Sequence, residues 1–283
     1  MVLKGAQALA APMSIYSGHW QISEDLSKQQ NLSELADYLE RSYEHAVDVN
    51  AFRAALAVGW YFDSNIPTGY GAGSSGALIA AIFDQFGKKN HLNLLELKTL
   101  LGGMESFFHG SSSGVDPLIC YQQETYLLEG KNSIKAVSLP SWSSQQYSFF
   151  LVDTGIKRKT GTYVNLFLKQ CEETTYMNRI RHEGIPLSNR AIKHFLAADF
   201  DQLYNDFAAI STFQWDCFGR MIPQTMHSPW LMGMRGAAFK LKICGAGGGG
   251  FLLGMTKDLV ATQAIFPDLI LINDELKSSH HSI

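Results

Sequence analysis

The sequence predicts an α+β fold in which strands alternate with helices. Its 283 residues suffice for one large domain or two ordinary domains. Several segments repeat apolar residues at helical spacing, and short apolar runs of strand character follow in the second half. We therefore expect two domains, covering residues 1–146 and 147–283.

The first half contains mostly helical signals. From Leu32 to Val47 the apolar positions follow helical spacing, with charged residues between them. The apolar run from Ala54 to Phe62 fits a helix or a strand, and Pro67 ends it. Leu92 to Phe108 is predicted to be a helix, although its two central glycines each cost about 1 kcal/mol relative to alanine. His109 to Asp116 is expected to be a loop.

The second half mixes both kinds of signal. Tyr147 to Asp153 has strand character and ends at a Thr-Gly turn. Helical patterns follow at about 162–182, 188–198 and 199–219. Two strand-like runs, Ala238 to Cys244 and Gly250 to Met255, flank a glycine-rich segment, and a short helix and a last apolar run, Leu269 to Ile272, close the pattern.

Composition excludes several classes of protein. The net charge of −3 argues against a nucleic-acid binder that depends on phosphate neutralisation. No apolar run approaches the roughly 18 to 20 residues that a membrane span requires. The cysteines are scattered without a CxxC pair, which is typical of reduced thiols in a cytoplasmic protein. They are Cys120, Cys171, Cys217 and Cys244.

The most informative segment is Asn65 to Gly76, Asn-Ile-Pro-Thr-Gly-Tyr-Gly-Ala-Gly-Ser-Ser-Gly, which leads into an apolar helix. Glycines allow a ligand to approach backbone N–H groups closely, and a helix start adds unpaired donors. The segment therefore predicts a phosphate cradle. It contains a formal dinucleotide fingerprint, but no strand runs directly into the first glycine, and no Gly-Lys-Ser/Thr ending marks a Walker loop. The alternative is a glycine-rich turn that caps a core helix.

Two further segments complete a candidate site. Glu105 and Asp116 could supply a magnesium ligand and a proton acceptor, because Mg²⁺ prefers oxygen ligands and is usually shared with nucleotide phosphates. The alternative is a surface Glu105–His109 pair and a turn aspartate. Gly245 to Gly250 holds five glycines in six residues. This run indicates close approach of a backbone or a ligand, or else a flexible hairpin tip.

Together these motifs resemble the GHMP kinases, the family of galactokinase, homoserine kinase, mevalonate kinase and phosphomevalonate kinase. Pro67 to Ala77 resembles the second family motif, and Lys242 to Gly250 resembles the third. Two features resemble mevalonate kinase most. They are the spacing from Glu105 to the His-Gly-Ser-Ser-Ser-Gly-Val-Asp loop and the segment from Leu151 to Thr160. The resemblance implies an N-terminal domain of the ribosomal-protein-S5 type (domain 2) and a ferredoxin-like C-terminal domain.

The resemblance also implies roles for individual residues. Asp116 would be the catalytic base, Glu105 and Ser75 would hold Mg²⁺, and Arg158 and Thr160 would lie near the transferred phosphate or the acceptor. The two glycine segments would bind ATP. The residues implied in that binding are Gly69, Gly71, Gly73, Ser74, Ser75, Gly76, Gly245, Gly247 and Gly248.

Three departures from the family pattern stand out. Ser112 replaces a usual proline and Gly76 a usual alanine. The first motif, with its lysine near the phosphates, is missing, because the first residues of the chain resemble the family segment on the C-terminal side of that motif. We therefore expect Met1 to be an internal methionine and the natural chain to begin upstream. Upstream codons without a Gly-Lys…Gly-Glu motif would contradict this.

The implied activity is ATP- and Mg²⁺-dependent phosphorylation of a small-molecule hydroxyl, first of all that of mevalonate in isoprenoid synthesis. Phosphomevalonate or a sugar is the alternative acceptor, and a phosphorylated one would call for a basic cluster such as Lys157 to Lys159, which is otherwise a solvated turn. A non-catalytic nucleotide-binding pseudokinase is the alternative from another class. An NAD-dependent oxidoreductase leaves Glu105, Asp116 and the second glycine run unexplained. No nucleic-acid or membrane partner is expected, and a homodimer is one option for the assembly.

Overall fold

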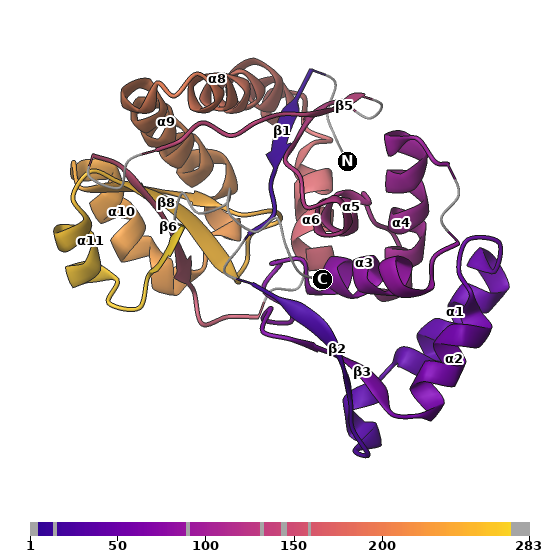
Figure 1. The fold of residues 1–283 in the computed structure, drawn as a ribbon. Helices are drawn as coiled ribbons and strands as arrows, with labels where there is room; N and C mark the ends of the chain where they lie inside the picture. The colour runs from indigo at the N-terminus through magenta and orange to yellow at the C-terminus, as the bar shows by residue number, and fades with distance from the viewer. Residues whose placement is uncertain are drawn as a thin grey trace.

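The computed structural model describes residues 5–13, 16–88, 91–130, 133–142, 146–157 and 160–272. In Figure 1, helices α3, α4 and α5 gather at the right, and the paired strands β2 and β3 and helices α1 and α2 extend below them. A sheet that contains β6 and β8 lies at the left with α10 and α11, and α8 and α9 lie above it.

The N-terminal half contains two small antiparallel sheets. In the first, β1 (Gln7–Ala10) pairs with β4 (Tyr126–Glu129), which pairs with β5 (Ser133–Ala136). In the second, β2 (Gly18–Ile22) pairs with β3 (Trp60–Ser64). The helices are α1 (Leu32–Tyr43), α2 (Val49–Ala57), α3 (Ser74–Phe86), α4 (Leu94–His109) and α5 (Val115–Gln122), and a 3₁₀ turn covers Leu26–Gln29.

One apolar cluster holds these five helices together. Its buried members run along the chain from Leu32 to Tyr126 and include Phe52, Ile79, Ile82, Leu101 and Leu118. The predicted helix from Leu92 is confirmed as α4, which begins with a capping box between Asn93 and Glu96. This packing fixes α3, α4 and α5 against one another, and all three contribute to the candidate site.

Two expectations for this half were incomplete. The run from Ala54 to Phe62 is neither one helix nor one strand, because Gly59 separates the end of α2 from β3 at a φ of 90°. A Cβ atom there would overlap with the carbonyl oxygen of Ser23. The predicted loop from His109 to Asp116 is wrong at both ends, because His109 is still the last residue of α4. Gly114 caps α5 in the left-handed conformation, so Asp116 lies in the first helical turn.

The C-terminal half is built on a four-stranded antiparallel sheet of order β7-β8-β6-β9. The strands are β6 (Ser148–Asp153), β7 (Phe239–Ile243), β8 (Phe251–Thr256) and β9 (Ile270–Ile272). Helices lie between β6 and β7 and between β8 and β9, which is the β-α-β-β-α-β arrangement of ferredoxin-like folds. The predicted strands and the ferredoxin-like architecture are therefore confirmed.

The helices of this half differ in detail from their prediction. They are α6 (Thr160–Gln170), α7 (Thr174–Arg179), a π-helical turn (Ile180–Gly184), α8 (Ile185–Leu196), α9 (Phe200–Phe218), α10 (His227–Arg235) and α11 (Leu259–Ile265), with 3₁₀ turns at Gly219–Met221 and Gln224–Met226. The helix expected at about 162–182 is interrupted after Gln170, and α10 was not predicted. Its apolar residues are separated by Pro229 and Gly233, which weaken a helical signal.

The sheet is covered on both faces. Alternate side chains of β6 point to opposite faces, so Phe149 joins one cluster while Phe150 and Val152 join another. The first cluster includes Leu203 and Phe207 of α9. The second includes Trp230 of α10, which is fully buried. The clusters of the C-terminal half begin at Trp142, while the division of domains at residue 146 remains a prediction.

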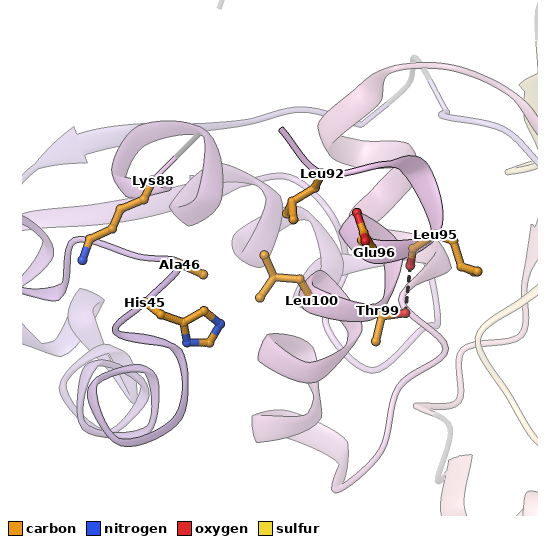
Figure 2. A pocket seen from close by; sticks show the side chains of 8 residues that line it. All are labelled: His45, Ala46, Lys88, Leu92, Leu95, Glu96, Thr99 and Leu100. Atoms are coloured by element: carbon orange, nitrogen blue, oxygen red, sulfur yellow. Dashed lines mark hydrogen bonds between the residues drawn. The ribbon is translucent and has the colours of Figure 1, made fainter. Parts of the chain in front are cut away.

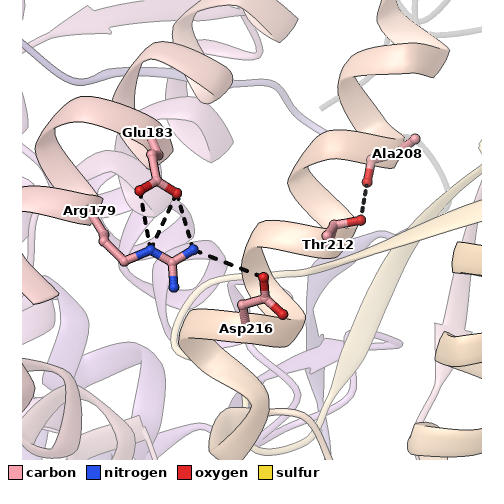
Figure 3. A network of polar contacts seen from close by, with 5 residues as sticks. All are labelled: Arg179, Glu183, Ala208, Thr212 and Asp216. Carbon is pink, nitrogen blue, oxygen red and sulfur yellow. Dashed lines mark hydrogen bonds and ion pairs between the residues drawn. The ribbon is translucent and has the colours of Figure 1, made fainter.

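A polar network joins the π-helical turn to α9 (Figure 3). The guanidinium of Arg179 donates to Glu183, with nitrogen–oxygen distances of 3.1–3.3 Å, and lies 4.0 Å from a carboxylate oxygen of Asp216. Thr212 on α9 donates to the carbonyl of Ala208 at 3.1 Å. The three charged side chains are 41–50% exposed, so we assign this network no more than about 0.5 kcal/mol of stability.

Replacing Tyr16 with phenylalanine is expected to stabilise the chain. Its hydroxyl is buried and has no hydrogen-bond partner among the described residues, and burial together with the charge of Asp153 raises its pKa. An unsatisfied buried hydroxyl costs free energy, so Tyr16→Phe should raise the free energy of unfolding by about 1 kcal/mol in urea titrations.

Tyr61→Phe is the matched control, because the Tyr61 hydroxyl donates to Gln21 at 2.7 Å. It should lower the free energy of unfolding by about 1 kcal/mol. Equal losses in both variants would show that the Tyr16 hydroxyl has a partner.

Candidate active site

The predicted cradle joins β3 to the start of α3. Gly69, Gly71 and Gly73 have φ values of 83°, 68° and 83°, a region that side chains with a Cβ rarely adopt. Gly73 is the N-cap of α3 and carries no side chain that could occupy the first helical N–H groups. Free donors and the positive end of the helix dipole favour an anion at this position.

Glu105 on α4 is the acidic centre of the site. It is only 4% exposed, and its carboxylate accepts from the hydroxyl of Ser75 at 2.8 Å and from the hydroxyl of Ser112. The Ser75 oxygen also lies 3.1 Å from Nε2 of His109. Glu105 is therefore not part of a solvated Glu–His pair, because its carboxylate is turned toward the first turn of α3.

Sequence reasoning missed the part played by Ser112, which it treated only as a replacement of proline. Its hydroxyl accepts from the backbone N–H of Gly114 at 3.0 Å while donating to Glu105. A serine two residues before a glycine can form this kind of turn. That local pattern is the signal that could have identified it.

Asp116 reaches the cradle from the first turn of α5. It is exposed, and a Cβ atom placed on Gly73 would lie 3.8 Å from its Cβ. A Cβ atom placed on Gly76 would lie 2.8 Å from the same atom. Asp116 thus lies beside the start of α3 while remaining accessible, and the start of α5 favours its negative charge.

The negative charge of Glu105 and Asp116 affects the pKa of a neighbouring thiol. Burial, followed by the charges of Asp116 and Glu105, raises the pKa of Cys120 to about 12. Cys120 is consequently protonated at neutral pH and is no thiolate nucleophile. Two carboxylate charges near one thiol make this part of the site negative, which favours a bound cation.

The second glycine segment forms the turn between β7 and β8 and packs against three other segments. Gly247, Gly248 and Gly250 have φ values of 71°, 77° and 68°. A Cβ atom on Gly248 would overlap with the ring of Tyr163, and one on Gly250 would overlap with the carbonyl oxygen of Tyr70. The glycines allow other groups to approach the backbone closely, as the sequence indicates, and the groups that do so here are protein atoms. Nucleotide contacts of this segment remain a prediction.

These contacts bring the two glycine segments together. Tyr70 belongs to the cradle, and its ring lies 5.4 Å from that of Phe251 between centroids. The backbone N–H of Gly250 donates to the carbonyl of Ile156 at 2.7 Å, and the carbonyl of Gly250 accepts from Thr154. The cradle, the β7–β8 turn and the segment after β6 therefore meet in one place.

Comparison with known proteins gives one family match. Residues 31–124 match the family model described as GHMP kinases N terminal domain. That range contains the cradle, Glu105 and Asp116. This part of the chain is similar to GHMP kinase N-terminal domains. The family that the glycine motifs predicted is confirmed, while no curated protein sequence matches the chain.

Solved structures share the GHMP kinase fold across almost the whole chain. A mevalonate kinase of L. major in complex with R-mevalonate is 17% identical, with a TM-score of 0.63 and coverage of 92% of this chain and 84% of that one. A Lactococcus lactis galactokinase with galactose is 15% identical, with a TM-score of 0.62 and coverage of 92% and 82%.

A third solved structure contains both a phosphorylated compound and a nucleotide analogue. A Streptococcus pneumoniae phosphomevalonate kinase in complex with phosphomevalonate and AMPPNP is 13% identical, with a TM-score of 0.59 and coverage of 93% and 89%. At these identities the comparisons establish the GHMP kinase fold, and they leave the acceptor of this chain to experiment.

Two predicted site residues are not placed by the structure. Arg158 lies outside the described residues, and Thr160 begins α6 with its side chain outside the described part of the chain. Their roles remain predictions. None of the described helices is both long enough and apolar enough to cross a membrane.

The residues of this candidate site fit a magnesium ion that is shared with a nucleotide. A carboxylate and a hydroxyl, those of Glu105 and Ser75, lie 2.8 Å apart beside the cradle, and both offer the oxygen atoms that Mg²⁺ prefers. Within the described ranges there is no group of three or more metal-binding His, Cys, Asp or Glu side chains. Mg²⁺ bound through nucleotide phosphates needs only one or two protein carboxylates.

A separate groove of about 440 Å³ lies away from the cradle, near the opposite end of α3 (Figure 2). Most of its polar side chains form hydrogen bonds within the chain. Lys88 donates to the carbonyl of Glu44, Thr99 donates to that of Leu95, and Glu96 accepts from the N–H of Asn93. We assign it no part in catalysis. The lining residues are His45, Ala46, Lys88, Leu92, Leu95, Glu96, Thr99 and Leu100.

Replacing Gly250 with alanine is expected to disrupt the junction of the glycine segments. The change imposes a left-handed conformation on alanine, which costs about 1–2 kcal/mol, and it pushes a methyl group onto the Tyr70 carbonyl. We expect urea unfolding to show a total loss of about 3 kcal/mol or more.

Gly130→Ala is the matched control, since Gly130 has a φ of 70° and, apart from its chain neighbours, no described residue has an atom within 4 Å of an added Cβ. Its free energy of unfolding should fall only by the conformational cost of about 1–2 kcal/mol. Similar losses in the two variants would mean that the contact with Tyr70 does not constrain the turn.

Proposed function

We propose that this chain is an ATP- and Mg²⁺-dependent kinase that phosphorylates the hydroxyl group of a small molecule, mevalonate in the first instance. The observation that carries the proposal is the arrangement of Glu105, Ser75 and Asp116 around the first turn of α3. This arrangement supplies an anion site, oxygen ligands for a metal and an accessible carboxylate within a GHMP kinase domain.

In the proposed reaction, the acceptor hydroxyl oxygen attacks the γ-phosphorus of ATP and its proton passes to the carboxylate of Asp116. The bond between the γ-phosphorus and the β–γ bridging oxygen breaks, and ADP leaves with the bonding electrons. The backbone N–H groups at the start of α3 hold the phosphates in place. Glu105 and Ser75 would hold Mg²⁺, which neutralises developing phosphate charge when bound. Positioning and charge stabilisation supply most of the rate enhancement.

Mevalonate is proposed because of the resemblance of the Glu105-to-Asp116 segment to mevalonate kinase. The mevalonate kinase structure with R-mevalonate supports it by its fold alone. The galactokinase and phosphomevalonate kinase structures make a sugar and a phosphorylated acceptor the compounds to compare. The proposed location is the cytoplasm, in keeping with the four free cysteines, and homodimer formation stays a prediction.

The test is release of ADP from Mg-ATP with mevalonate, phosphomevalonate and galactose supplied separately. Release that depends on mevalonate, with a phosphorylated product identified by mass spectrometry, would support the full proposal. Release of ADP with another compound would support the kinase activity and would show that the acceptor is that compound instead of mevalonate. Binding of Mg-ATP without turnover of any hydroxyl compound would favour a pseudokinase and defeat the proposal.

A further inference from the structure

Lys157 extends along the first glycine of the cradle from the other half of the chain. It is an exposed residue in the segment between β6 and α6. A Cβ atom placed on Gly69 would lie 3.7 Å from Cβ of Lys157 and 3.8 Å from both its Cγ and its Cδ. Three consecutive stem carbons at nearly equal distance mean that the side chain lies flat over Gly69, with its ammonium group two bonds farther on.

The backbone that carries Lys157 is held in place immediately before it. The carbonyl of Ile156 accepts from the N–H of Gly250 at 2.7 Å. The carbonyl of Gly250 accepts from the N–H of Thr154 at 3.1 Å and from its hydroxyl at 2.7 Å. Gly250 in turn packs on the carbonyl of Tyr70. The β7–β8 turn thus fixes the segment before Lys157 relative to the cradle, and this position differs from that of a freely moving surface lysine.

Lys157 brings a full positive charge to the described part of the site. Glu105 and Asp116 each bring a negative charge to the cradle, and the helix start offers only partial positive charge. A nucleotide polyphosphate would add several more negative charges. A lysine ammonium is a compact positive charge with three hydrogen-bond donors, which suits a phosphate oxygen.

We propose that Lys157 binds a phosphate group of the nucleotide at the entrance of the cradle, beside Gly69. The inference rests on the proposed function and adds to it a cationic side chain from the C-terminal half. The nucleotide is favoured over a phosphorylated acceptor because the lysine stem lies on Gly69, which belongs to the segment that leads into the anion site of α3.

The experiment measures binding of AMPPNP with Mg²⁺, and separately of adenosine, by isothermal titration calorimetry without any acceptor. Lys157→Gln should weaken AMPPNP binding by about tenfold, because a charge-assisted contact is lost. The difference should shrink as KCl is raised. Lys157→Arg should retain most of the affinity. Adenosine has no phosphates and should bind both proteins equally. The matched control is Lys193→Gln, an exposed lysine on α8, which should leave both affinities unchanged.

Three results would overturn the inference. AMPPNP affinity unchanged in Lys157→Gln would show that the stem only covers Gly69. Unchanged AMPPNP affinity with a raised KM for phosphomevalonate would assign the charge to the acceptor. Equal weakening of AMPPNP and adenosine would indicate a shape change of the site. A parent chain that binds no nucleotide would instead defeat the proposed function itself, so the two failures are distinguishable.

Discussion

Asp116→Asn is expected to lower the rate of phosphoryl transfer by about 10²–10⁴-fold while Mg-AMPPNP still binds. Asparagine keeps the size of the side chain and cannot accept the acceptor proton as a carboxylate does. Asp116 is exposed and lies in the first turn of α5 beside Gly73 and Gly76, so its replacement should leave the fold intact. Steady-state ADP release and calorimetric titration of AMPPNP measure the two effects separately.

The control for this variant is Asp268→Asn, an exposed aspartate that lies between α11 and β9. It should keep full turnover. Turnover of Asp116→Asn within a few-fold of the parent chain would remove Asp116 from the role of base, even if the protein proves to be a kinase.

Glu105→Gln is expected to raise the Mg²⁺ concentration needed for half-maximal activity by about tenfold or more, with partial rescue by excess Mg²⁺. The amide keeps the shape of the side chain and removes its negative charge. Its nitrogen cannot accept, so only one of the two serine hydroxyls can still donate a hydrogen bond to residue 105. ADP release as a function of free Mg²⁺ gives the measurement.

Ser112→Ala separates the charge of Glu105 from its hydrogen bonds. It removes one hydroxyl that donates to Glu105 and leaves the carboxylate in place. Its Mg²⁺ requirement should therefore change much less than that of Glu105→Gln. Identical Mg²⁺ curves for the parent chain and Glu105→Gln would mean that Glu105 only supports Ser75 and the neighbouring loop.

Periodicity and glycine motifs predicted the parts of the fold that depend on local sequence. Strands β6 and β8 contain nearly continuous apolar runs because both faces of their sheet are buried, and such runs stand out in a sequence. Strand β7 alternates apolar residues with Lys240 and Lys242. Helix α4 was predicted despite Gly102 and Gly103. A Cβ atom on Gly103 would overlap with the hydroxyl of Tyr43, so tertiary packing explains at least this glycine.

What the sequence could not predict depends on contacts between distant segments. Whether Glu105 lies on a solvated helix face was undecided until the structure showed it buried, with Ser75 and Ser112 on its two oxygens. The start of α5 at Val115 follows from the left-handed Gly114, which packs against the backbone of Lys98 on α4. The position of Lys157 beside Gly69 brings together two segments far apart in the chain, and no local pattern indicates it.

The packing at Gly76 limits how freely this cradle could be exchanged between proteins. A methyl group at position 76 would lie 2.8 Å from Cβ of Asp116 and 2.8 Å from the backbone nitrogen of Pro117. The usual alanine of the family motif would therefore require α5 to move away, and the carboxylate at its start would move with it. A cradle grafted from a relative would carry its own spacing between α3 and α5. The smallest transferable unit is consequently the cradle together with the first turn of α5.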